Sequence, residues 1–411
     1  MDSTPAGAGK HLPLILTVNG GSSSIKFAVY PARAKKPDDR PLLFGGIEGI
    51  GTNRMRLQVF DSRARLLVTK QVRGRNHRKA AAILTNFLRQ NPYGDRIAAV
   101  GHRVVHGGTR LNRHTVITAK VLAELKQSVP LDPAHLPGEI MLILAMTDAF
   151  PAAIQVVCLD TAFHLNLPRA AQLFPIPQSL TRRGVRRFGF HGLSYSFLME
   201  ALQRIVPSHA RGRVILAHLG SGASMAAVNG GRPVDTTMGF TPTAGLVMAT
   251  RPGDMDPGLL VYLMRRIPLT PAAADRFINE DCGLKGISGR TGDMRQLHQL
   301  ASRSASCREA IQAFCRRARA AIAALAAGMG GLDVLVFSGG IGEHDAAVRR
   351  DICSGLDFIG VRLNPEANRK HRQAISAANA DVLVFVIPTD EQKMIARIVR
   401  NLARSRLRMR Q

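Results

Sequence analysis

Apolar and polar positions alternate along the chain in short blocks that predict strands and helices in turn. Short apolar runs predict strands at residues 14–18, 25–30, 154–159, 332–337 and 383–387. Apolar positions at helical spacing predict helices at residues 79–90 and, in a long alanine-rich segment, at residues 307–329. A basic helix is predicted at the end of the chain. Strands that alternate with helices in this way are typical of an α/β protein.

One unit of this pattern occurs twice, two hundred residues apart. Residues 15–30 read ILTVNGGSSSIKFAVY, and residues 215–228 read ILAHLGSGASMAAV. Each is an apolar strand, a turn of glycine and serine, and a second apolar strand. Such a turn exposes backbone N–H groups that bind phosphate oxygens, although glycine and serine are also common in ordinary hairpins. Two copies predict two facing domains that hold one nucleotide between them.

Length and composition limit the class of protein. The chain has 411 residues, enough for two or three domains. Hydrophobic residues make up 45% of it, which excludes a chain that is disordered throughout. No apolar run approaches the roughly 20 residues of a membrane-spanning helix, so we expect no integral membrane protein. The apolar residues 12–18 lead straight into a glycine-rich turn, which favours a strand over a signal peptide.

Cysteines are spread singly along the sequence. They are Cys158, Cys282, Cys307, Cys315 and Cys353. Their odd number and the absence of a C-x-x-C pair disfavour a disulfide framework and a zinc knuckle. We therefore expect a cytoplasmic protein whose cysteines are reduced and mostly buried.

Basic residues dominate the charge. Lys and Arg number 56 against 29 Asp and Glu, which gives a net charge of +27. This excess fits a nucleic-acid partner or an enzyme that handles anionic small molecules. Arginine is dense only at residues 397–410, and aromatic residues make up 5% of the chain with no tryptophan. Stacking platforms for single strands are therefore scarce, which favours small anionic ligands over nucleic acid.

Three titratable side chains stand in motifs that a core strand would not use. Arg103 lies between glycines in GHRVVHGG, and arginine suits bidentate recognition of carboxylate or phosphate; a surface arginine is the alternative. Asp160 follows the predicted strand 154–159, where ligands of α/β sheets gather; a helix N-cap is the alternative. His191 lies between glycines and phenylalanines in FGFHG; a structural histidine is the alternative.

Three further segments add groups for phosphate and metal. Residues 238–257 form a long segment, punctuated by glycine and proline, that contains Arg251. Residues 338–343, SGGIGE, follow a predicted strand and precede a predicted helix, where a nucleotide could lie. In residues 388–391, PTDE, two carboxylates suggest Mg²⁺, with a helix cap as the alternative. The sequence has no Walker loop and no hydrolase signature, so these groups together indicate phosphoryl transfer.

Nine motifs, in order along residues 15–398, resemble those of acetate kinases. They are NGGSSSIKFAVY, GHRVVHGG, DTAFH, RRFGFHG, HLGSGAS, DTTMGFTP, GLVMATRPGDMDP, FSGGIGEH and IPTDEQ. The resemblance implies the duplicated two-domain α/β fold of actin, sugar kinases and heat-shock chaperone ATPases, with the nucleotide in the interdomain cleft. It implies an N-terminal acyl-kinase domain, residues 1–162 plus 386–411, closed by the C-terminal helix. Residues 163–385 would then form the nucleotide-binding domain.

The resemblance also implies an activity and its partners. Acetate kinases transfer the γ-phosphoryl group of ATP reversibly to a short-chain carboxylate, which gives acyl phosphate and ADP. The transfer is direct and in line, acetate is the expected acid, and the enzymes are homodimers. The expected cofactor is Mg²⁺, with Mn²⁺ as an alternative. A carboxylate nucleophile is already ionised at neutral pH, so the reaction needs no strong base.

Site residues are implied position by position. The catalytic residues are Arg103, Asp160, His191 and Arg251. The acyl substrate is bound by Arg103, Val105, His135, Phe190 and Pro242. The nucleotide and its phosphates are bound by Ser22, Ser24, Lys26, His218, Leu219, Gly220, Ser221, Gly222, Asp293, Met294, Arg295, Gly339, Gly340, Ile341 and Gly342. The metal is held by Asn19 and Glu391, with Asp160 nearby.

Several positions depart from the family pattern. Ala134 stands where a leucine helps to close the acyl pocket, so an acid longer by one or two methylenes could enter. Ser221 replaces an asparagine and has a shorter reach toward the transition state. The remaining departures are Gly20, Leu136, Gly138, Glu139, Leu193 and Tyr195 in place of the Thr and His of Thr-Ser-His, Ala244, Ala249, His344 and Gln392. Two alternatives stay open: a kinase that prefers propionate or butyrate, and a nucleotide-binding relative with altered catalysis.

Overall fold

The computed structural model of the chain describes residues 12–21, 23–33, 40–52, 54–74, 76–267 and 269–404. Tertiary contacts divide the chain into two compact units: residues 1–162 with 391–411, and residues 163–390. The resemblance implies that the chain returns to the first domain at residue 386. The tertiary contacts place the start of this returning segment at Glu391.

The first unit is built on one mixed sheet, which has eight strands in the described residues. They are β1 (Leu14–Gly20), β2 (Ser24–Pro31), β3 (Leu43–Glu48), β4 (Arg56–Asp61), β5 (Leu66–Gln71), β6 (Ile97–Val104), β7 (Thr115–Val116) and β8 (Ile154–Leu159). Their order is β5-β4-β3-β2-β1-β6-β8-β7. β1 to β5 pair in antiparallel succession, whereas β1, β6 and β8 are parallel. The carboxyl ends of these three parallel strands therefore meet at one edge.

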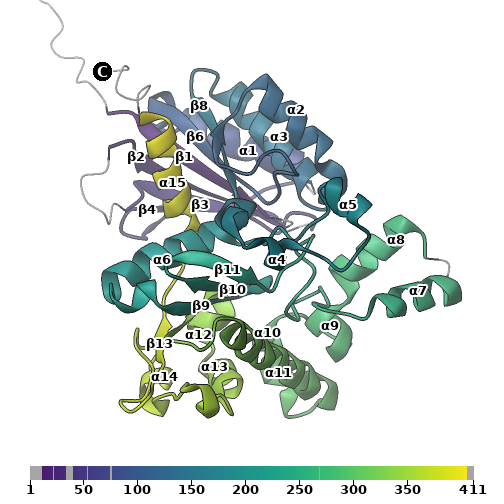
Figure 1. Ribbon diagram of the computed structural model, residues 1–411. Coiled ribbons are helices and arrows are strands. Elements are labelled where there is room, and N and C mark those ends of the chain that lie inside the picture. The colour runs from purple at the N-terminus through teal and green to yellow at the C-terminus, as the bar shows by residue number, and fades with distance from the viewer. Residues whose placement is uncertain are drawn as a thin grey trace, which may run out of the picture. The chain divides into compact units, whose positions relative to one another are not determined.

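Helices cover both faces of this sheet (Figure 1). They are α1 (His77–Gln90), α2 (Ala119–Gln127), α3 (Leu136–Ala149) and α15 (Glu391–Leu402). Leu14, Leu16 and Val18 of β1 share one core cluster with Leu84 of α1 and Leu142 of α3. Because side chains alternate along a strand, the other residues of β1 face the opposite side, on which α15 packs.

Glycine at one position of β6 allows α15 to lie directly on the sheet. A Cβ atom at Gly101 would lie 2.5 Å from Ile395 Cγ2 and 2.6 Å from Val399 Cγ2. Any side chain there would push α15 away from the strand. The first residue of this helix, Glu391, is thereby held near the edge where the parallel strands end.

The second unit is built on a smaller sheet of the same design. Its strands, five in the described residues, are β9 (Arg213–Leu219), β10 (Ala223–Asn229), β11 (Arg232–Thr236), β12 (Val334–Ser338) and β13 (Leu383–Val386). Their order, β11-β10-β9-β12-β13, repeats the order β3-β2-β1-β6-β8 of the first sheet. In both, an antiparallel meander is followed by two parallel strands. This duplication confirms the expected α/β fold of the actin-like ATPase type.

The helices of the second unit lie on and around its sheet, with α6 above the strands and α11 below them in Figure 1. They are α4 (Arg169–Gln172), α5 (Gln178–Arg182), α6 (Gly192–Ile205), α7 (Pro257–Arg266), α8 (Pro271–Arg276), α9 (Gly283–Ser288), α10 (Met294–Ala301), α11 (Ala305–Gly328), α12 (Gly339–His344), α13 (Ala346–Cys353) and α14 (Pro365–Arg369). A short 3₁₀ helix, Asp160–Asn166, follows β8.

The long helix α11 shows why its sequence is helical. The hydroxyl of Ser304 accepts a hydrogen bond from Cys307 N and caps the first turn. Alanine, the best helix former, is the commonest residue in the helix. Ile311, Phe314 and Ile322 belong to a buried stripe at helical spacing that packs on the sheet. The expected helix at residues 307–329 is confirmed with bounds two residues and one residue earlier.

The elements predicted from the apolar pattern are present at their expected places. β1, β2, β8, β12 and β13 lie on the five predicted strands, and α1 contains the predicted helix at residues 79–90. Within the described part of the chain, no helix combines the length and the apolar character needed to cross a membrane.

Candidate active site

Four predicted residues of the first unit meet at the edge where its parallel strands end. Asn19 lies near the end of β1, Arg103 near the end of β6, and Asp160 directly after β8. The Arg103 guanidinium donates to Asp160 Oδ2 through Nη2 at 2.6 Å and through Nε at 3.1 Å. Its Nη1 lies 3.4 Å from Asn19 Oδ1, and Asn19 Nδ2 donates to Glu391 Oε2 at 2.8 Å. The structure therefore brings these four residues together, and their joint role in catalysis stays a prediction.

The charges of this cluster stabilise a permanently cationic arginine. Burial alone would lower the pKa of Arg103, but the carboxylates of Asp160, Glu391 and Glu139 raise it above its usual value. The side chain of Asp160 is fully buried, and that of Arg103 is 15% exposed. The ion pair therefore fixes the orientation of a partly accessible guanidinium, which is suited to binding an anion.

The first glycine-serine hairpin also lies at this edge. Gly21 N donates to Ser24 O across the turn, and the register of β1 and β2 places Lys26 beside Asn19. Lys26 is exposed and Ser24 is half-buried, so both are accessible to a phosphate. The predicted phosphate ligand Ser22 lies outside the described residues.

The predicted acyl-binding residues Val105 and His135 are held by acidic side chains. His135 lies at the N-terminal end of α3, and its Nδ1 is 2.8 Å from Oδ1 of the buried Asp132. One turn further along α3, the buried Glu139 carboxylate accepts from Val105 N at 3.1 and 3.3 Å. In the sequence, Glu139 stands out only as a departure from the family pattern. The feature that could have identified it is an acidic residue at the start of an apolar helical stretch.

Glu139 is a carboxyl group in an apolar setting. Burial raises its pKa to about 8, although the positive charge of Arg103 and the Val105 N–H oppose the shift. The negative charges of Asp132 and Asp160 add to it. Glu139 therefore titrates near neutral pH, close to the guanidinium expected to bind the carboxylate substrate.

Two predicted histidines of the second unit are stacked on each other. The ring centroids of His191 and His218 lie 4.4 Å apart, with an interplanar angle of 26°. His191 Nδ1 lies 2.8 Å from Ser224 Oγ, which also contacts the hydroxyl of Tyr195. His218 is likewise bonded through Nδ1, to Ser194 Oγ at 2.9 Å. In each histidine a serine hydroxyl lies at Nδ1, and Nε2 lies near a glycine of the second hairpin.

A third histidine, His164 in the motif DTAFH, holds the loop that carries His191. His164 Nε2 donates to Phe190 O at 3.0 Å, and burial lowers the pKa of His164 to about 4, so it is neutral. Gly189 has φ +70°, and a Cβ there would lie 2.5 Å from the His164 ring. His191 itself is left-handed, with φ +59°. The glycine that flanks His191 is thus required by close packing, as its position in the motif suggested.

The second glycine-serine hairpin lies against the glycine-rich helix α12. A Cβ on Gly339, which has φ +76°, would lie 2.7 Å from Leu219 O. A Cβ on Gly220 would lie 3.9 Å from Gly340 N, and one on Gly222 would lie 3.3 Å from His191 Nε2. The predicted nucleotide residues Leu219, Gly220, Ser221, Gly222, Gly339, Gly340, Ile341 and Gly342 are thus brought together with His191 and His218. The motif SGGIGE, residues 338–343, is predicted from the sequence to precede a helix. The helix begins within the motif, at Gly339.

Arg251 is held by the segment that also carries the predicted acyl-pocket residue Pro242. Its Nη1 donates to Pro242 O at 3.0 Å, and Ala249 N donates to Ser221 O at 3.0 Å. The long segment 238–257 is therefore anchored to the second hairpin. Phe190 and Pro242 are both buried.

The predicted adenosine residues lie at the start of α10. Asp293 caps this helix, because its carboxylate accepts from Arg295 N at 2.8 Å and from Gln296 N at 3.4 Å. The Arg295 side chain also bonds to it, and these hydrogen bonds lower the pKa of Asp293. Met294 is buried and Arg295 is exposed. The cap gives Asp293 a structural role, and the adenosine role stays a prediction.

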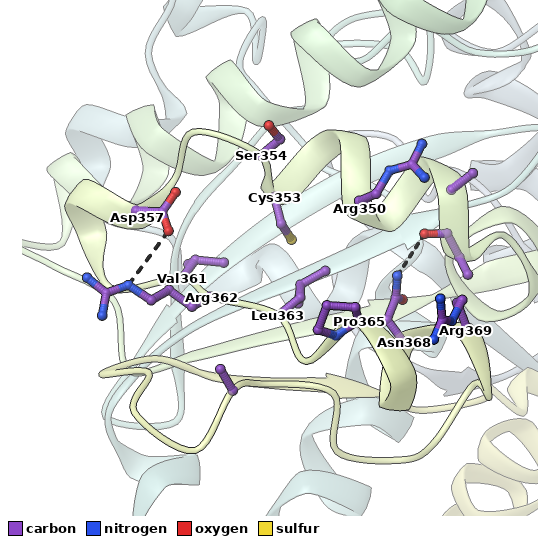
Figure 2. A pocket seen from close by; sticks show the side chains of 13 residues that line it. Arg350, Cys353, Ser354, Asp357, Val361, Arg362, Leu363, Pro365, Asn368 and Arg369 are labelled. Atoms are coloured by element: carbon purple, nitrogen blue, oxygen red, sulfur yellow. Dashed lines mark hydrogen bonds and ion pairs between the residues drawn. The ribbon is translucent and has the colours of Figure 1, made fainter.

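A cavity of about 710 Å³ lies in the second unit between α13 and α14 (Figure 2). Arg350, Arg362 and Arg369 stand around apolar walls that include Val361 and Leu363. No residue predicted to bind substrate, nucleotide or metal lines it. The predicted site and this cavity are therefore separate features of the molecule.

The described residues contain no cluster of three or more His, Cys, Asp or Glu side chains that could hold a metal ion. Asn19 and Glu391 offer an amide and a carboxylate oxygen, which are ligands that Mg²⁺ accepts, usually with several waters. These two residues fit a magnesium site with few protein ligands.

The duplicated fold, the arginines and the paired histidines define a class of phosphotransferases with the actin-like ATPase fold. The model of the Acetokinase family matches residues 14–397, and the chain belongs to this family. It is 42% identical to the acetate kinase of Rhodopseudomonas palustris strain TIE-1 over 95% of this chain and 98% of that protein. It is 37% identical to the acetate kinase of Clostridioides difficile strain 630 over 93% and 98%.

Solved structures give the same assignment. The acetate kinase of Porphyromonas gingivalis matches with a TM-score of 0.83 and 33% identity, over 95% of this chain and 99% of that one. A propionate kinase of Francisella tularensis matches with a TM-score of 0.88 and 34% identity, over 95% and 100%. Members named for two different acids therefore share this fold and align along nearly the whole chain.

Proposed function

We propose that the chain catalyses reversible transfer of the γ-phosphoryl group of ATP to the carboxylate of a short-chain acid, with acetate as the principal substrate. The products are acyl phosphate and ADP. The observation that carries this proposal is the orientation of Arg103 by the buried Asp160 at the carboxyl ends of parallel strands, in a chain of the Acetokinase family. A fixed, partly accessible guanidinium at that edge is suited to a carboxylate or a phosphoryl group.

The residues of both units supply what in-line phosphoryl transfer requires. The transition state carries negative charge on the equatorial oxygens of the moving group, and catalysis consists mostly of positioning and charge stabilisation. Arg103 and Arg251 provide positive charge, and His191 provides an N–H donor. Arg103 belongs to the first unit, and Arg251 and His191 belong to the second.

Asn19 and Glu391 are proposed to hold Mg²⁺, with Mn²⁺ as a substitute, and Asp160 lies near them. The ion would neutralise charge on the ATP phosphates. The chain's own part is to keep these oxygens in place: Asn19 Nδ2 donates to Glu391, and Asn19 Oδ1 lies close to Arg103 Nη1. The nucleotide is proposed to lie along both glycine-serine hairpins and the start of α12.

The acid is proposed to bind with its carboxylate at Arg103 and its alkyl group among Val105, His135, Phe190 and Pro242. Ala134, which is exposed two residues before α3, stands where the family has a larger leucine. We expect propionate to be accepted as well, since each buried methylene contributes only about 0.8 kcal/mol.

We also propose that the chain forms a homodimer in the cytoplasm. Helix α7 has no buried residue, and its exposed side chains include Leu259, Val261, Tyr262 and Met264. A row of exposed apolar residues of this kind is typical of an interaction surface. All five cysteines lie in described segments and are free thiols, as a reducing compartment requires.

A hydroxylamine trap for acyl phosphate tests the reaction directly. The purified chain is incubated with ATP, Mg²⁺ and, separately, acetate, propionate and butyrate. Acyl hydroxamate is expected with acetate and propionate. An Arg103→Ala variant is the matched control, and it should lose more than 99% of the product because it lacks the guanidinium.

The second candidate is a nucleotide-binding relative with altered catalysis, and Ser221 is the observation that favours it. The family has asparagine at this position, and the serine side chain is exposed at the tip of the second hairpin. ATP binding without hydroxamate in the same preparation would support this candidate. Recovery of product in Ser221→Asn would then identify the serine as its cause.

A further inference from the structure

A line of hydroxyl groups leads to His191 from inside the second unit. The Tyr195 hydroxyl contacts Ser224 Oγ, and Ser224 Oγ lies 2.8 Å from His191 Nδ1. Tyr195 and Ser224 are both completely buried. Tyr195 lies on α6 and Ser224 on β10, so two different elements fix the geometry of this line.

Tyr195 stands where the family has a histidine. Its ring is held by aromatic neighbours: its centroid lies 5.6 Å from that of Phe163 and 5.8 Å from that of His164. The contact with His164 is edge-on, at 85°. This packing leaves the hydroxyl little freedom, so its contact with Ser224 is a fixed feature of the fold.

The chemistry of the two hydroxyls sets the direction of the protons. A phenol is a stronger acid than an aliphatic hydroxyl, so Tyr195 is the better donor and Ser224 accepts from it. The single proton of Ser224 is then directed at His191 Nδ1, which must be the unprotonated nitrogen of the ring. The remaining nitrogen, Nε2, carries the hydrogen and faces the turn of the second hairpin, where a Cβ on Gly222 would lie 3.3 Å away.

The neighbouring histidine has the same arrangement. Thr389 Oγ1 donates to Ser194 Oγ at 2.8 Å, and Ser194 Oγ lies 2.9 Å from His218 Nδ1. Each imidazole thus meets a serine that already accepts a proton from a second hydroxyl. Because the two rings are stacked with centroids 4.4 Å apart, two imidazolium charges would repel strongly. The repulsion disfavours protonation of both rings at once, and the hydroxyl contacts favour hydrogen on Nε2 of a neutral ring.

We propose that Tyr195 is a positioning residue that acts through Ser224 to hold His191 as the neutral tautomer with hydrogen on Nε2. In this state His191 donates a hydrogen bond to an oxygen of the transferred phosphoryl group without changing its own protonation. This role rests on the proposed function, whereas the tautomer itself is a property of the protein without substrate. Among the groups that face His191 are His218 from β9, Ser224 from β10 and the Gly222 turn, with Tyr195 and His164 behind them.

Tyr195→Phe removes the hydroxyl and keeps the ring. Ser224 then no longer receives a proton, so it can accept one from His191 Nδ1–H as readily as donate. We expect nitrogen-15 NMR of histidine-labelled protein at pH 7.5 to show the Nε2–H tautomer for His191 in the parent chain, with the signal assigned by His191→Asn. In Tyr195→Phe the two tautomers should be mixed.

The kinetic consequence is specific to kcat. We expect kcat to fall about fivefold to tenfold, which is the size of one weakened transition-state hydrogen bond, while KM for ATP and acetate stays within twofold. The acid limb of the kcat profile should move to higher pH, since Ser224 can now accept from a protonated ring. Tyr195→His, the family residue, should restore both values, and Tyr93→Phe, at a half-buried position of the first unit, should change neither.

The outcomes distinguish the positioning role of Tyr195 from the proposed reaction. An Nδ1–H tautomer or an imidazolium in the parent chain at pH 7.5 overturns the proposal, as does a Tyr195→Phe protein with an unchanged tautomer and pH profile. If Tyr195→Phe does not fold, Ser224→Ala is measured instead, and the same loss of tautomer preference is expected. A parent chain with the expected tautomer but no acyl phosphate product would refute the proposed function. It would leave the proposed effect of Tyr195 on the His191 tautomer valid.

Discussion

Glu139 is a residue whose environment makes a prediction about stability. In the unfolded chain its pKa is about 4.3, and in the fold burial raises the pKa to about 8. Between these values the folded state keeps a proton that the unfolded state has lost, so the free energy of unfolding falls as pH rises. The Glu139→Gln side chain cannot ionise, so it does not cause this fall in the free energy of unfolding. The variant should therefore gain at least about 1 kcal/mol relative to the parent between pH 5 and pH 8.

Urea unfolding at the two pH values measures this difference. Titration of all other groups cancels in the comparison of variant and parent. Glu309→Gln, at an exposed position of α11, is the matched control and should show no pH-dependent gain. The same difference between Glu139→Gln and the parent at pH 5 and at pH 8 would show that Glu139 ionises normally in the fold.

Ala134 makes a prediction about substrate choice. It is exposed beside His135, and a leucine there would refill the space that a longer alkyl chain could occupy. Ala134→Leu should lower the ratio of kcat/KM for propionate to that for acetate about fourfold, as expected for one methylene at about 0.8 kcal/mol. Steady-state assays with both acids give the ratio, and an unchanged ratio would show that residue 134 does not border the alkyl group.

At the residue scale the sequence pointed to side chains with unusual neighbours along the chain. Arg103 and His191 are flanked by glycines, and Asp160 follows an apolar strand, so each could be found from its motif. Glu139 and Tyr195 could not, because what gives them meaning is distant in sequence: Val105 for the one and Ser224 for the other. A buried polar side chain is defined by its partner, and the partner is known only from the fold.

At the scale of elements, α13 links the cavity of Figure 2 to the glycine-rich helix α12. Its Arg349 is completely buried. Arg349 Nη1 donates to Gly342 O at 2.8 Å and to Glu343 O at 3.0 Å. On its other side it donates to Asn368, which lines the cavity, through Nε and Nη2 at 2.8 Å each. One guanidinium thus ties α12 to α14.

Arg349→Met should therefore loosen the glycine helix. The variant leaves several buried carbonyl oxygens unpaired, at a cost of roughly 1–3 kcal/mol each, so we expect a loss of at least about 3 kcal/mol of stability. We also expect KM for ATP to rise several-fold, because α12 carries predicted nucleotide residues. Thermal unfolding and ATP titration test the two effects.

The next residue provides the control for this experiment. Arg350 is exposed and pairs with Asp351, its neighbour in sequence. Arg350→Met should change stability by no more than about 0.5 kcal/mol and leave KM for ATP unaltered. Equal effects of the two substitutions would mean that the hydrogen bonds of Arg349 between α12 and α14 have no specific effect on stability or on KM for ATP.

The elements themselves divide into those that the sequence predicted and those that it did not. β8 and β12 are apolar at nearly every position, so they could be predicted as buried strands. β3 contains Gly45 and Gly46, where a Cβ would lie 2.1 Å from Gln58 O and 2.5 Å from Ile25 O, and β5 is largely exposed. The apolar residues of β3 are interrupted by these two glycines, and those of β5 are largely exposed, so neither strand could be predicted as a continuous buried run. The repeated hairpin, by contrast, predicted the duplication that the strand order confirms.

At the scale of the whole molecule, the proposed homodimer makes a prediction about α7. Asp256 caps this helix through Gly258 N, so α7 is a well-formed helix even though it buries none of its side chains. Val261, Tyr262 and Ile267 are 48–54% exposed. These exposed apolar side chains on a capped helix support the proposal that α7 contacts a second copy of the chain.

The double variant Tyr262→Glu/Ile267→Glu, which introduces two negative charges, should therefore convert a dimer into a monomer. Sedimentation equilibrium of the parent should give twice the chain mass of 44.5 kDa, and the variant should give a single chain mass at micromolar concentration. Leu66→Glu/Leu67→Glu, at equally exposed positions of the edge strand β5, is the control and should remain dimeric. A dimeric α7 variant would place the interface elsewhere, and a monomeric parent would refute the homodimer. Because each chain holds Arg103, Arg251 and both histidines, the monomer should retain the chemistry, and its kcat per chain should fall only as far as α7 supports the segment 238–257 that precedes it.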